Sequence, residues 1–513
     1  MRTGIVILRL WLRLIFAGLF LHSSHLCGQQ KPNGPSSATE LPLSGKQNQT
    51  GSVSTNQSTT NTGGGNSVNV LNSSVNVQGP YAGSVATGAN SGAVLPLRLD
   101  YALTLALRYN LGAVSQTNAM LQAEGARRVA RSTLMPNIDS SVSENVQQIN
   151  LRTLGVEIAS FPAVVGPFNY FDARAARLNQ SVLDFVRLGN LRSANENVAA
   201  AKHAARDARD LIVLAVGGAY LQLIASNARI AAAMAQVDSS QAVYGQAAAR
   251  LHAGVAARID VTRTQVQLQT DQQRLRSLLG DRDREMLALS RVIGLPLGQR
   301  FSITDDFPYA PLSGLTLEQA LEQANRDRAD LQSAEASLRA SNASLKAAHA
   351  ERLPNVNLYA DYGAAGLRPT DEAHGTFTVT GTVTIPLYTG GRIRGEIEQA
   401  LAAQRQRQAE LDDLRGQVDR DVRQAFIDLG VAADQVSVAQ SNVELAHDTL
   451  RQARDRFGSG VADTVEVVQA QQSVVQADND YISAVFEHNL AKVSLARALG
   501  KAEEGIAKLL VRK

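Results

Sequence analysis

Residues 396–457 carry a seven-residue repeat of apolar positions, and this stretch of 62 residues contains no proline. Large apolar residues recur every seven positions, and alanines fall between them. Large and small rows sustained over five heptads are typical of helices that pack closely in a coiled coil. At a rise of about 1.5 Å per residue, the pattern predicts a helix about 93 Å long. The large row is Val422, Leu429, Val436, Val443, Leu450 and Phe457, and the small row is Ala425, Ala432, Ala439, Ala446 and Ala453.

The same pattern occurs 206 residues earlier, so the chain contains this helix twice. We predict long helices at about 188–251 and 392–457. Shorter helices are predicted before and after each long one, at 99–133 and 259–293 in the first copy and at 317–352 and 465–499 in the second. Two shorter helices placed end to end match one long helix in length. The earlier large row is Val216, Leu223, Ile230, Val237, Tyr244 and Leu251, and the small row is Ala219, Ser226, Ala233, Ser240 and Ala247.

Matching segments place the two copies at residues 97–301 and 302–502. Pro136-Asn137 corresponds to Pro354-Asn355 at an offset of 218, whereas Gly254-Val255-Ala256 corresponds to Gly460-Val461-Ala462 at an offset of 206. The difference, 218 minus 206, is 12 residues. We expect these additional residues of the first copy in a loop that passes through Gly166-Pro167.

Strict alternation of apolar and hydroxyl residues marks a strand at residues 376–385. Ten alternating residues fit a membrane-barrel strand of about 9–11 residues, although a half-buried hairpin of a soluble protein has the same pattern. Residues 355–362 alternate in the same way and predict the partner strand. On the strand at residues 376–385, threonines lie on one face. The residues predicted to face lipid lie on the other face and are Phe377, Val379, Val383 and Ile385.

Two hairpins supply four strands per chain, which is too few for a closed barrel. About eight strands are the practical minimum. Backbone groups at an open sheet edge cannot be satisfied by lipid. If these strands lie in a membrane, several chains therefore share one barrel. The fold class predicted is mainly α, with a long coiled-coil helical tunnel and a shared membrane β-barrel, built from two structural repeats.

An export signal peptide is predicted at residues 1–28, where arginines precede a short apolar core at residues 14–21. Cys27, the only cysteine, stands where a lipoprotein signal carries its acylated residue. The preceding His25 and Leu26 differ from the small residues usual at that place. Lipidation of Cys27 and simple cleavage of the signal are thus two alternatives, and we favour cleavage.

Residues 29–96 are rich in Asn, Ser, Thr and Gly and carry almost no charge. Such a segment buries too little apolar surface to offset the entropy of ordering it, so we predict a flexible extension. Its role is not evident from the sequence. Residues 503–513 are assigned to a C-terminal tail.

Charge and composition argue against several classes of function. The formal net charge is only +3, and no run of Lys or Arg forms a basic patch of the kind that binds nucleic acid. The eight histidines are scattered, and no glycine-rich turn joins a strand to a helix as in nucleotide-binding proteins. We therefore predict no catalytic residues, no metal site and no cofactor, and we do not expect an enzyme.

Three motifs together resemble TolC-type outer-membrane efflux proteins, and the resemblance covers about residues 97–502. It implies a homotrimer with a 12-stranded barrel in the outer membrane and a helical tunnel that extends into the periplasm. It also implies a periplasmic adaptor protein and an inner-membrane pump as partners, so that the chain acts as a passive exit duct for efflux or type I secretion. The motifs are Ile385-Pro386-Leu387-Tyr388-Thr389-Gly390-Gly391-Arg392, Arg250-Leu251-His252-Ala253-Gly254-Val255 and Arg456-Phe457-Gly458-Ser459-Gly460-Val461.

The runner-up hypothesis is a secreted, elongated scaffold or adhesin without transport activity. A scaffold has no use for an apolar strand face, so the strand at 376–385 favours the channel. The transported substrate, the pump and the adaptor are not determined by the sequence, because a duct recognises its pump more than its cargo.

The resemblance also implies which residues close the tunnel and which bind the adaptor. Gate positions carried over from the family are Asp260, Phe457, Glu466 and Gln469. Gln469 stands where a relative has an acid, and Ala462 replaces a basic partner. Alternatively, Asp260 and Glu466 only favour the positive N-terminus of the helix that follows each glycine turn. The adaptor-contact positions at the helix tips are Arg250, Gly254, Val255, Ala256, Arg456, Gly460, Val461 and Ala462.

Overall fold

The computed structural model describes residues 52–60, 70–86, 88, 90, 92–155, 162–306, 308–312, 314–368 and 373–510. The predicted signal peptide and Cys27 lie outside these residues. Both halves of the chain contain the same order of elements: two helices, a β-hairpin, a long helix and a shorter helix. The first half contains α2 (Leu99–Tyr109), α3 (Leu111–Ser132), β4 (Asn137–Asn150), β5 (Val164–Leu183), α4 (Phe185–His252) and α5 (Arg258–Ile293). The second half contains α6 (Leu317–Asp327), α7 (Ala329–Ala350), β7 (Asn355–Gly366), β8 (His374–Thr384), α8 (Arg392–Gly458) and α9 (Thr464–Ala498).

The two long helices, α4 and α8, have 68 and 67 residues and confirm the heptad prediction. In α8 the alternating rows form the buried face. In α4 the small row is also on the packed face, but past Ala233 the large row is only half-buried, and Gln236 and Val243 take buried positions instead. The buried members of the two rows of α8 are Val422, Ala425, Ala432, Val436, Ala439, Leu450, Ala453 and Phe457.

Each predicted helix before a hairpin is broken into two, which corrects the expectation of continuous helices at 99–133 and 317–352. The breaks are at Asn110 (ψ 135°) and Arg328 (ψ 122°), which correspond at the offset of 218. Asn110 is fully buried, and its amide donates to Tyr81 O (2.8 Å) and Val292 O (3.1 Å). Arg328 is 5% exposed and pairs with Asp330. The buried contacts of these two polar side chains thus occur where the backbone leaves the helical conformation.

A four-stranded antiparallel sheet is formed by the two hairpins in the order β4-β5-β7-β8. The prediction of four strands is confirmed. The additional residues of the first copy lie partly in longer strands rather than only in the loop, because β5 already begins at Val164 and includes Gly166-Pro167. Strand β8 ends at Thr384, so Ile385 follows the strand directly.

Part of the predicted flexible extension is ordered, which corrects the expectation for residues 29–96. Strands β1 (Val53–Thr60) and β2 (Val70–Val77) pair as an antiparallel hairpin. The hairpin is held although the segment is polar, because Val53, Val75 and Val77 pack against the core formed around α4.

Short elements between the long helices surround the middle of α4. A turn of 3₁₀-helix, η1 (Gly79–Ala82), precedes the parallel pair β3 (Leu95–Leu97) and β6 (Phe301–Ile303). Most of the predicted C-terminal tail is helical, in α10 (Ala502–Leu510). This helix contacts α4 and α9. The largest core cluster joins these elements, and Tyr220, Ile293 and Val493 are among its fully buried residues.

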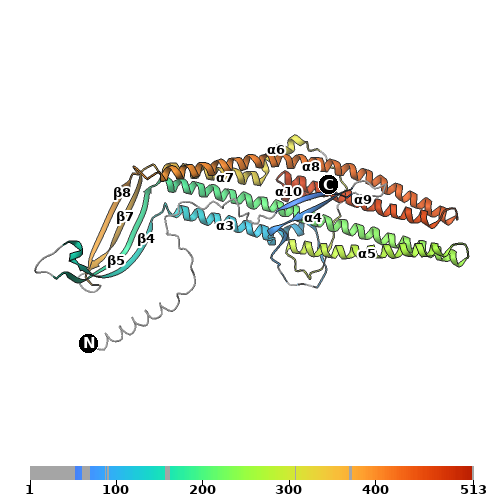
Figure 1. The fold of residues 1–513 in the computed structure, drawn as a ribbon, viewed down its shortest axis with the longest axis horizontal. Coiled ribbons are helices and arrows are strands. Elements are labelled where there is room, and N and C mark those ends of the chain that lie inside the picture. The colour runs from blue at the N-terminus through green and yellow to red at the C-terminus, as the bar shows by residue number, and fades with distance from the viewer. Residues whose placement is uncertain are drawn as a thin grey trace, which may run out of the picture. The chain divides into compact units, whose positions relative to one another are not determined.

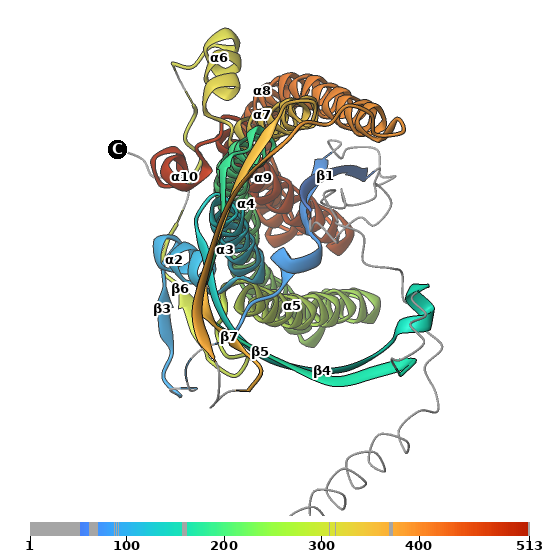
Figure 2. The same ribbon diagram turned by 90° about the vertical axis from the view of Figure 1, so that its left-hand side faces the viewer.

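Figures 1 and 2 show the arrangement within residues 50–513. The sheet lies at one end of the helices, and the α4–α5 and α8–α9 turns lie at the other end (Figure 1). Seen along the helices, α8, α7, α4, α3 and α5 follow an arc, and the sheet curves in the same sense (Figure 2). The fold therefore supplies a curved wall rather than a globular domain.

Candidate functional site

The four-stranded sheet has one exposed apolar face. On β8, Phe377 is 77% exposed, Val379 66% and Val383 61%. Tyr362 on β7 pairs with Phe377 and is 65% exposed. Ile385, just after β8, is also exposed. Within the described residues nothing covers this face, which is the condition expected of side chains that face lipid.

The opposite face of the sheet carries charges that pair with one another. The Arg174 guanidinium donates from Nη1 to Asp361 Oδ1 (2.6 Å) and to Thr376 Oγ1 (2.9 Å). Its Nε lies 2.7 Å from Asp172 Oδ1. A charged side chain that faced lipid would be costly, so this face is not the one that a membrane would cover. Pairing across strands allows β5 to carry these charges within the sheet.

The two helix tips end in the same backbone motif. Gly254 and Gly460 have positive φ angles of 73° and 77°, a conformation that favours glycine. Val255 N donates to Arg250 O (3.0 Å), and Val461 N donates to Arg456 O (2.9 Å). This bond from the second residue past the cap is the Schellman motif. The predicted turns are thus helix-ending motifs repeated at the offset of 206.

Side-chain contacts at the tips connect the pair α4–α5 with the pair α8–α9. Arg250 Nη1 donates to Phe457 O (2.7 Å), and its Cζ lies 4.7 Å from the centre of the Phe457 ring. Thr464 Oγ1 donates to Asp260 Oδ1 (2.8 Å) and accepts from Arg263 Nη1 (3.0 Å). We call these two sets of bonds the tip contacts.

The four predicted gate residues have different surroundings in the structure. Phe457 is 5% exposed and packs in a cluster with Leu450 and Val467, so its ring is part of the core of the tip. The carboxylate of Asp260 belongs to the tip contacts, while the Glu466 carboxylate lies 3.4 Å from Arg456 Nε. Gln469 is exposed on α9.

The alternative role of helix cap is taken by another residue in α9. The Asp463 side chain accepts from Val465 N (3.0 Å) and Glu466 N (3.2 Å). Helix α5 is preceded by Ala257, which makes no side-chain cap bond. Asp260 and Glu466 lie in the first turn of their helices, where a carboxylate is favourable, but their side chains bind groups elsewhere.

Most residues predicted to contact an adaptor are at the surface of the tips. Val255 and Val461 are 66% and 72% exposed. Gly254, Gly460 and Arg456 are also exposed, and Ala256 and Ala462 are half-buried. Arg250 differs, because its guanidinium points to Phe457 and connects the two tips.

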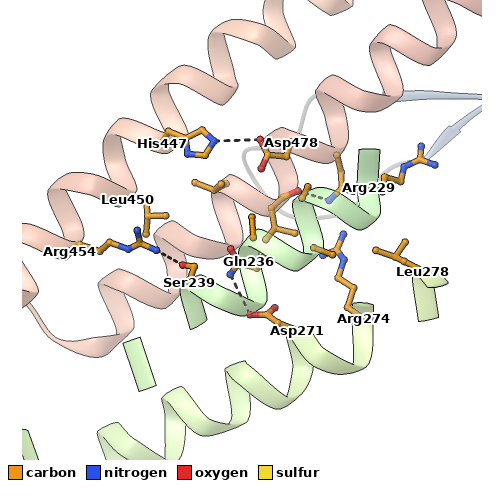
Figure 3. A pocket seen from close by; sticks show the side chains of 16 residues that line it. Arg229, Gln236, Ser239, Asp271, Arg274, Leu278, His447, Leu450, Arg454 and Asp478 are labelled. Atoms are coloured by element: carbon orange, nitrogen blue, oxygen red, sulfur yellow. Dashed lines mark hydrogen bonds and ion pairs between the residues drawn. The ribbon is translucent and has the colours of Figure 1, made fainter. Parts of the chain in front are cut away.

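A cavity of about 200 Å³ lies between the pairs α4–α5 and α8–α9, further from the tips (Figure 3). Arg454 donates to Ser239 across it, and Gln471 Nε2 donates to the same hydroxyl (2.8 Å). Gln236 Nε2 lies 3.3 Å from Asp271 Oδ2. The bonds to Ser239 connect the two pairs here, beside an apolar cluster in which Val243 of α4 packs with Leu450 of α8 and Val474 of α9.

A histidine and a half-buried carboxyl, in contact with each other, complete the lining of this cavity. His447 Nε2 lies 3.6 Å from Asp478 Oδ1 (Figure 3). Burial raises the pKa of the Asp478 carboxyl above its ordinary value, and His447 partly offsets this. Among the described residues, no three His, Cys, Asp or Glu side chains converge in a way that could hold a metal ion.

Sequence reasoning missed Arg263, Thr464, Ser239 and Arg454, which all connect the two helix pairs. The spacing of Asp260 and Arg263, one helical turn apart, was the only local signal for one of them. The other bonds join residues more than 200 positions apart. Such contacts depend on how the helices are placed in space.

Helix α4 also contains an 18-residue window with the composition of a membrane span. Of that window, 67% is buried inside the structure. Its apolar residues pack against α2, α10 and the β1–β2 hairpin, so we assign them to the core.

Comparison with known proteins identifies the class. The model of the outer membrane efflux protein family matches residues 105–295 and 320–501. The chain therefore belongs to the outer membrane efflux protein family. The prediction of a TolC-type outer-membrane channel is confirmed, and the scaffold hypothesis is set aside.

Individual relatives agree over most of the chain. The pyoverdine export outer membrane protein OpmQ of Pseudomonas putida is 24% identical over 416 residues, which is 78% of this chain and 85% of that protein. The alkaline protease secretion protein AprF of Pseudomonas aeruginosa is 22% identical over 440 residues, 81% of this chain and 89% of that protein. The CmeC outer membrane channel of Campylobacter jejuni has the same fold, with a TM-score of 0.70 at 16% identity over 80% of this chain and 88% of that one.

Proposed function

We propose that three copies of this chain share one 12-stranded barrel in the outer membrane and enclose a helical tunnel in the periplasm. The open sheet carries this proposal. Its outer strands, β4 and β8, each have a strand partner on one side only among the described residues. An edge of unpaired backbone groups cannot face lipid, and four strands cannot close a barrel. Three copies of four strands give 12.

The assembled channel is proposed to be a passive exit duct that receives its cargo from an inner-membrane pump through a periplasmic adaptor. The relatives OpmQ and AprF are named for export of pyoverdine and for secretion of alkaline protease, cargoes of very different size. We infer that a channel of this kind recognises its pump and adaptor rather than its cargo. The exposed Val255 and Val461 at the helix tips support the tips as the adaptor-binding surface.

The tip contacts are proposed to hold the tunnel closed at its periplasmic end. Opening would separate α4–α5 from α8–α9, so the bonds of Arg250 to Phe457 and of Thr464 to Asp260 would have to break. In a trimer Glu466 would occur three times around the axis. Like charges in a narrow neck repel one another and attract cations. Although Arg456 lies 3.4 Å from each Glu466 carboxylate and offsets part of its charge, we propose that this ring makes the closed channel select cations.

Single-channel conductance in planar bilayers tests the duct and its gate together. The parent protein should conduct and prefer cations. Glu466→Gln should weaken that preference, and Glu466→Gln combined with Asp260→Asn should weaken it further and reduce block by divalent cations added from the periplasmic side. Ser473→Ala, at an exposed position of the same helix, serves as the uncharged control. Unchanged selectivity in both acid variants would assign these carboxylates a purely structural role, and a parent protein that never conducts would contradict the duct.

A further inference from the structure

The β1–β2 hairpin lies directly on the backbone of α4 at the midpoint of that helix. Strand β2 contacts α4 and α9, and Val75 packs on Gly218. A Cβ placed on Gly218 would lie 2.3 Å from Val75 Cγ2, so only glycine leaves room for the hairpin here. The hairpin is therefore docked at the middle of the helical layer.

The opposite face of α4 is covered by the β3–β6 pair. Successive residues of a helix turn by about 100°, so Tyr220, two residues after Gly218, points about 200° away from it. The Tyr220 hydroxyl lies 2.9 Å from Leu97 O and 2.9 Å from Asp305 Oδ2. Helix α4 thus separates the hairpin from the β3–β6 pair.

Figure 2 shows which of these two sides is concave. Viewed along the helices, β1 lies inside the arc of α8, α7, α4, α3 and α5, on the side toward which the sheet also curves. Strands β3 and β6 and helices α2, α6 and α10 lie outside the arc. If copies of this wall close around an axis, the concave side becomes the inner side.

We propose that the β1–β2 hairpin lies inside the passage of the assembled channel and narrows it at the middle of the helical layer. The inference rests on the proposed assembly of several chains around one axis. Each copy would contribute one hairpin, so the insert would be repeated around the passage at one height. It would be a second constriction, distant from the helix tips.

The chemistry of the insert indicates what it would select. Neither β1 nor β2 contains a charged residue; their polar residues are Ser, Thr, Asn and Gln. The hairpin thus adds no charged residue to the passage, so we expect it to select cargo by size rather than by charge. A cavity of about 320 Å³ lies beside Val53, Ser54 and Thr55, between β1 and the helices. The exposed Ser54 borders this cavity and is accessible to a reagent.

A pair of serines on opposite faces of the wall provides the test. Ser54 on β1 and Ser302 on β6 are both exposed strand residues. Ser54→Cys and Ser302→Cys would each be made in a Cys27→Ser background, and open channels in planar bilayers would be treated with a positively charged methanethiosulfonate reagent. Modification at residue 54 should lower the conductance in steps. Modification at residue 302 should leave it unchanged. Mass measurement confirms that both cysteines have reacted.

A deletion of residues 53–77 is the second variant, and it should increase the conductance and admit larger uncharged polymers into the passage. Complete modification at residue 54 without a change in conductance would overturn the placement, as would a conductance loss from residue 302 alone. If the deletion variant does not fold, the conductances of the two modified cysteine variants still test whether the hairpin lies in the passage. If the parent forms no channel at all, the proposed duct function is contradicted. That outcome differs from a parent that conducts but whose conductance does not change when residue 54 is modified.

Discussion

Buried polar residues fix the joints between the elements of this protein. Lys492 and His488 are each 1% exposed on α9, and Lys492 Nζ donates to Ala310 O (2.5 Å) in the segment after β6. The Tyr309 ring lies 4.7 Å from that of His488. One exposed segment is therefore held to the helical wall by groups whose charge depends on pH.

Acid should weaken the structure through His488. Burial, with a smaller effect of the positive Lys492, lowers the pKa of His488 to about 4. In the unfolded chain a histidine titrates near 6.5, so between these values the unfolded state binds more protons and stability falls as the pH falls. We expect the parent to lose about 2 kcal/mol more than His488→Gln between pH 7.5 and pH 5.

Chemical denaturation in detergent at the two pH values measures this difference. His252→Gln, at an exposed position of the tip, is the matched control and should behave like the parent. Burial raises the pKa of Asp207 and Asp210, an effect of opposite sign, so the variant must be compared with the parent and not judged alone. Equal acid sensitivity of His488→Gln and the parent would show that His488 titrates normally.

At the scale of elements, small residues allow the helices to approach closely. A Cβ placed on Gly189 of α4 would lie 2.7 Å from Ala347 Cβ of α7. Gly294 follows α5 and Gly500 follows α9, at equivalent positions of the two repeats. A Cβ on Gly294 would lie 2.8 Å from Tyr109 Cβ, and a Cβ on Gly500 would lie 2.8 Å from Arg328 Cα. Each repeat thus places a helix end against the break in the helix that precedes its hairpin.

The alanine row of α8 should not tolerate a larger side chain. Ala439 is 6% exposed and packs in a cluster with Val436 and Ala484. Ala439→Leu should lower the free energy of unfolding by about 1–3 kcal/mol, because added methylene groups force neighbouring side chains apart. Gln440→Leu, at the adjacent exposed position, should change it little. Denaturant titration of the helix signal measures both, and equal effects would contradict the assignment of the packed face.

At the scale of the whole molecule, the described residues form a curved, open wall. In the part of the chain that the structure describes, the sheet has two open edges and one exposed apolar face, and the helices follow an arc. In a single copy, the backbone groups at the sheet edges lack strand partners and the arc of helices stays open. Burial of the sheet edges, rather than a large globular core, is what we expect to drive assembly.

Mass measurement of the detergent-solubilised protein should give a species of three chains. The physical reason is the unpaired backbone of β4 and β8, which neighbouring copies would pair. The same sample should give one chain after denaturation. A stable monomer with full helix content would contradict shared closure of the barrel.

The repeated helices, the four strands and the glycine turns could be predicted from the sequence, because each depends on local periodicity or on a residue type. The seven-residue repeat in α8 and the alternation in β8 belong to this group. The family resemblance also depended on such local motifs. The exposed face of β8 could be read from alternation alone, since side chains of a strand point to opposite faces.

Three features were determined only by the tertiary structure. They are the positions of the helix breaks at Asn110 and Arg328, the formation of the β1–β2 hairpin and the partners of Asp260. Asn110 interrupts a helix because Tyr81 O and Val292 O accept from its amide, and Val292 is 182 residues away. The polar hairpin is ordered because α4 offers a glycine beneath Val75. Asp260 binds Thr464 across the two helix pairs, 204 positions apart. Local pattern determines which elements form, whereas contacts between distant residues determine where they end and what they touch.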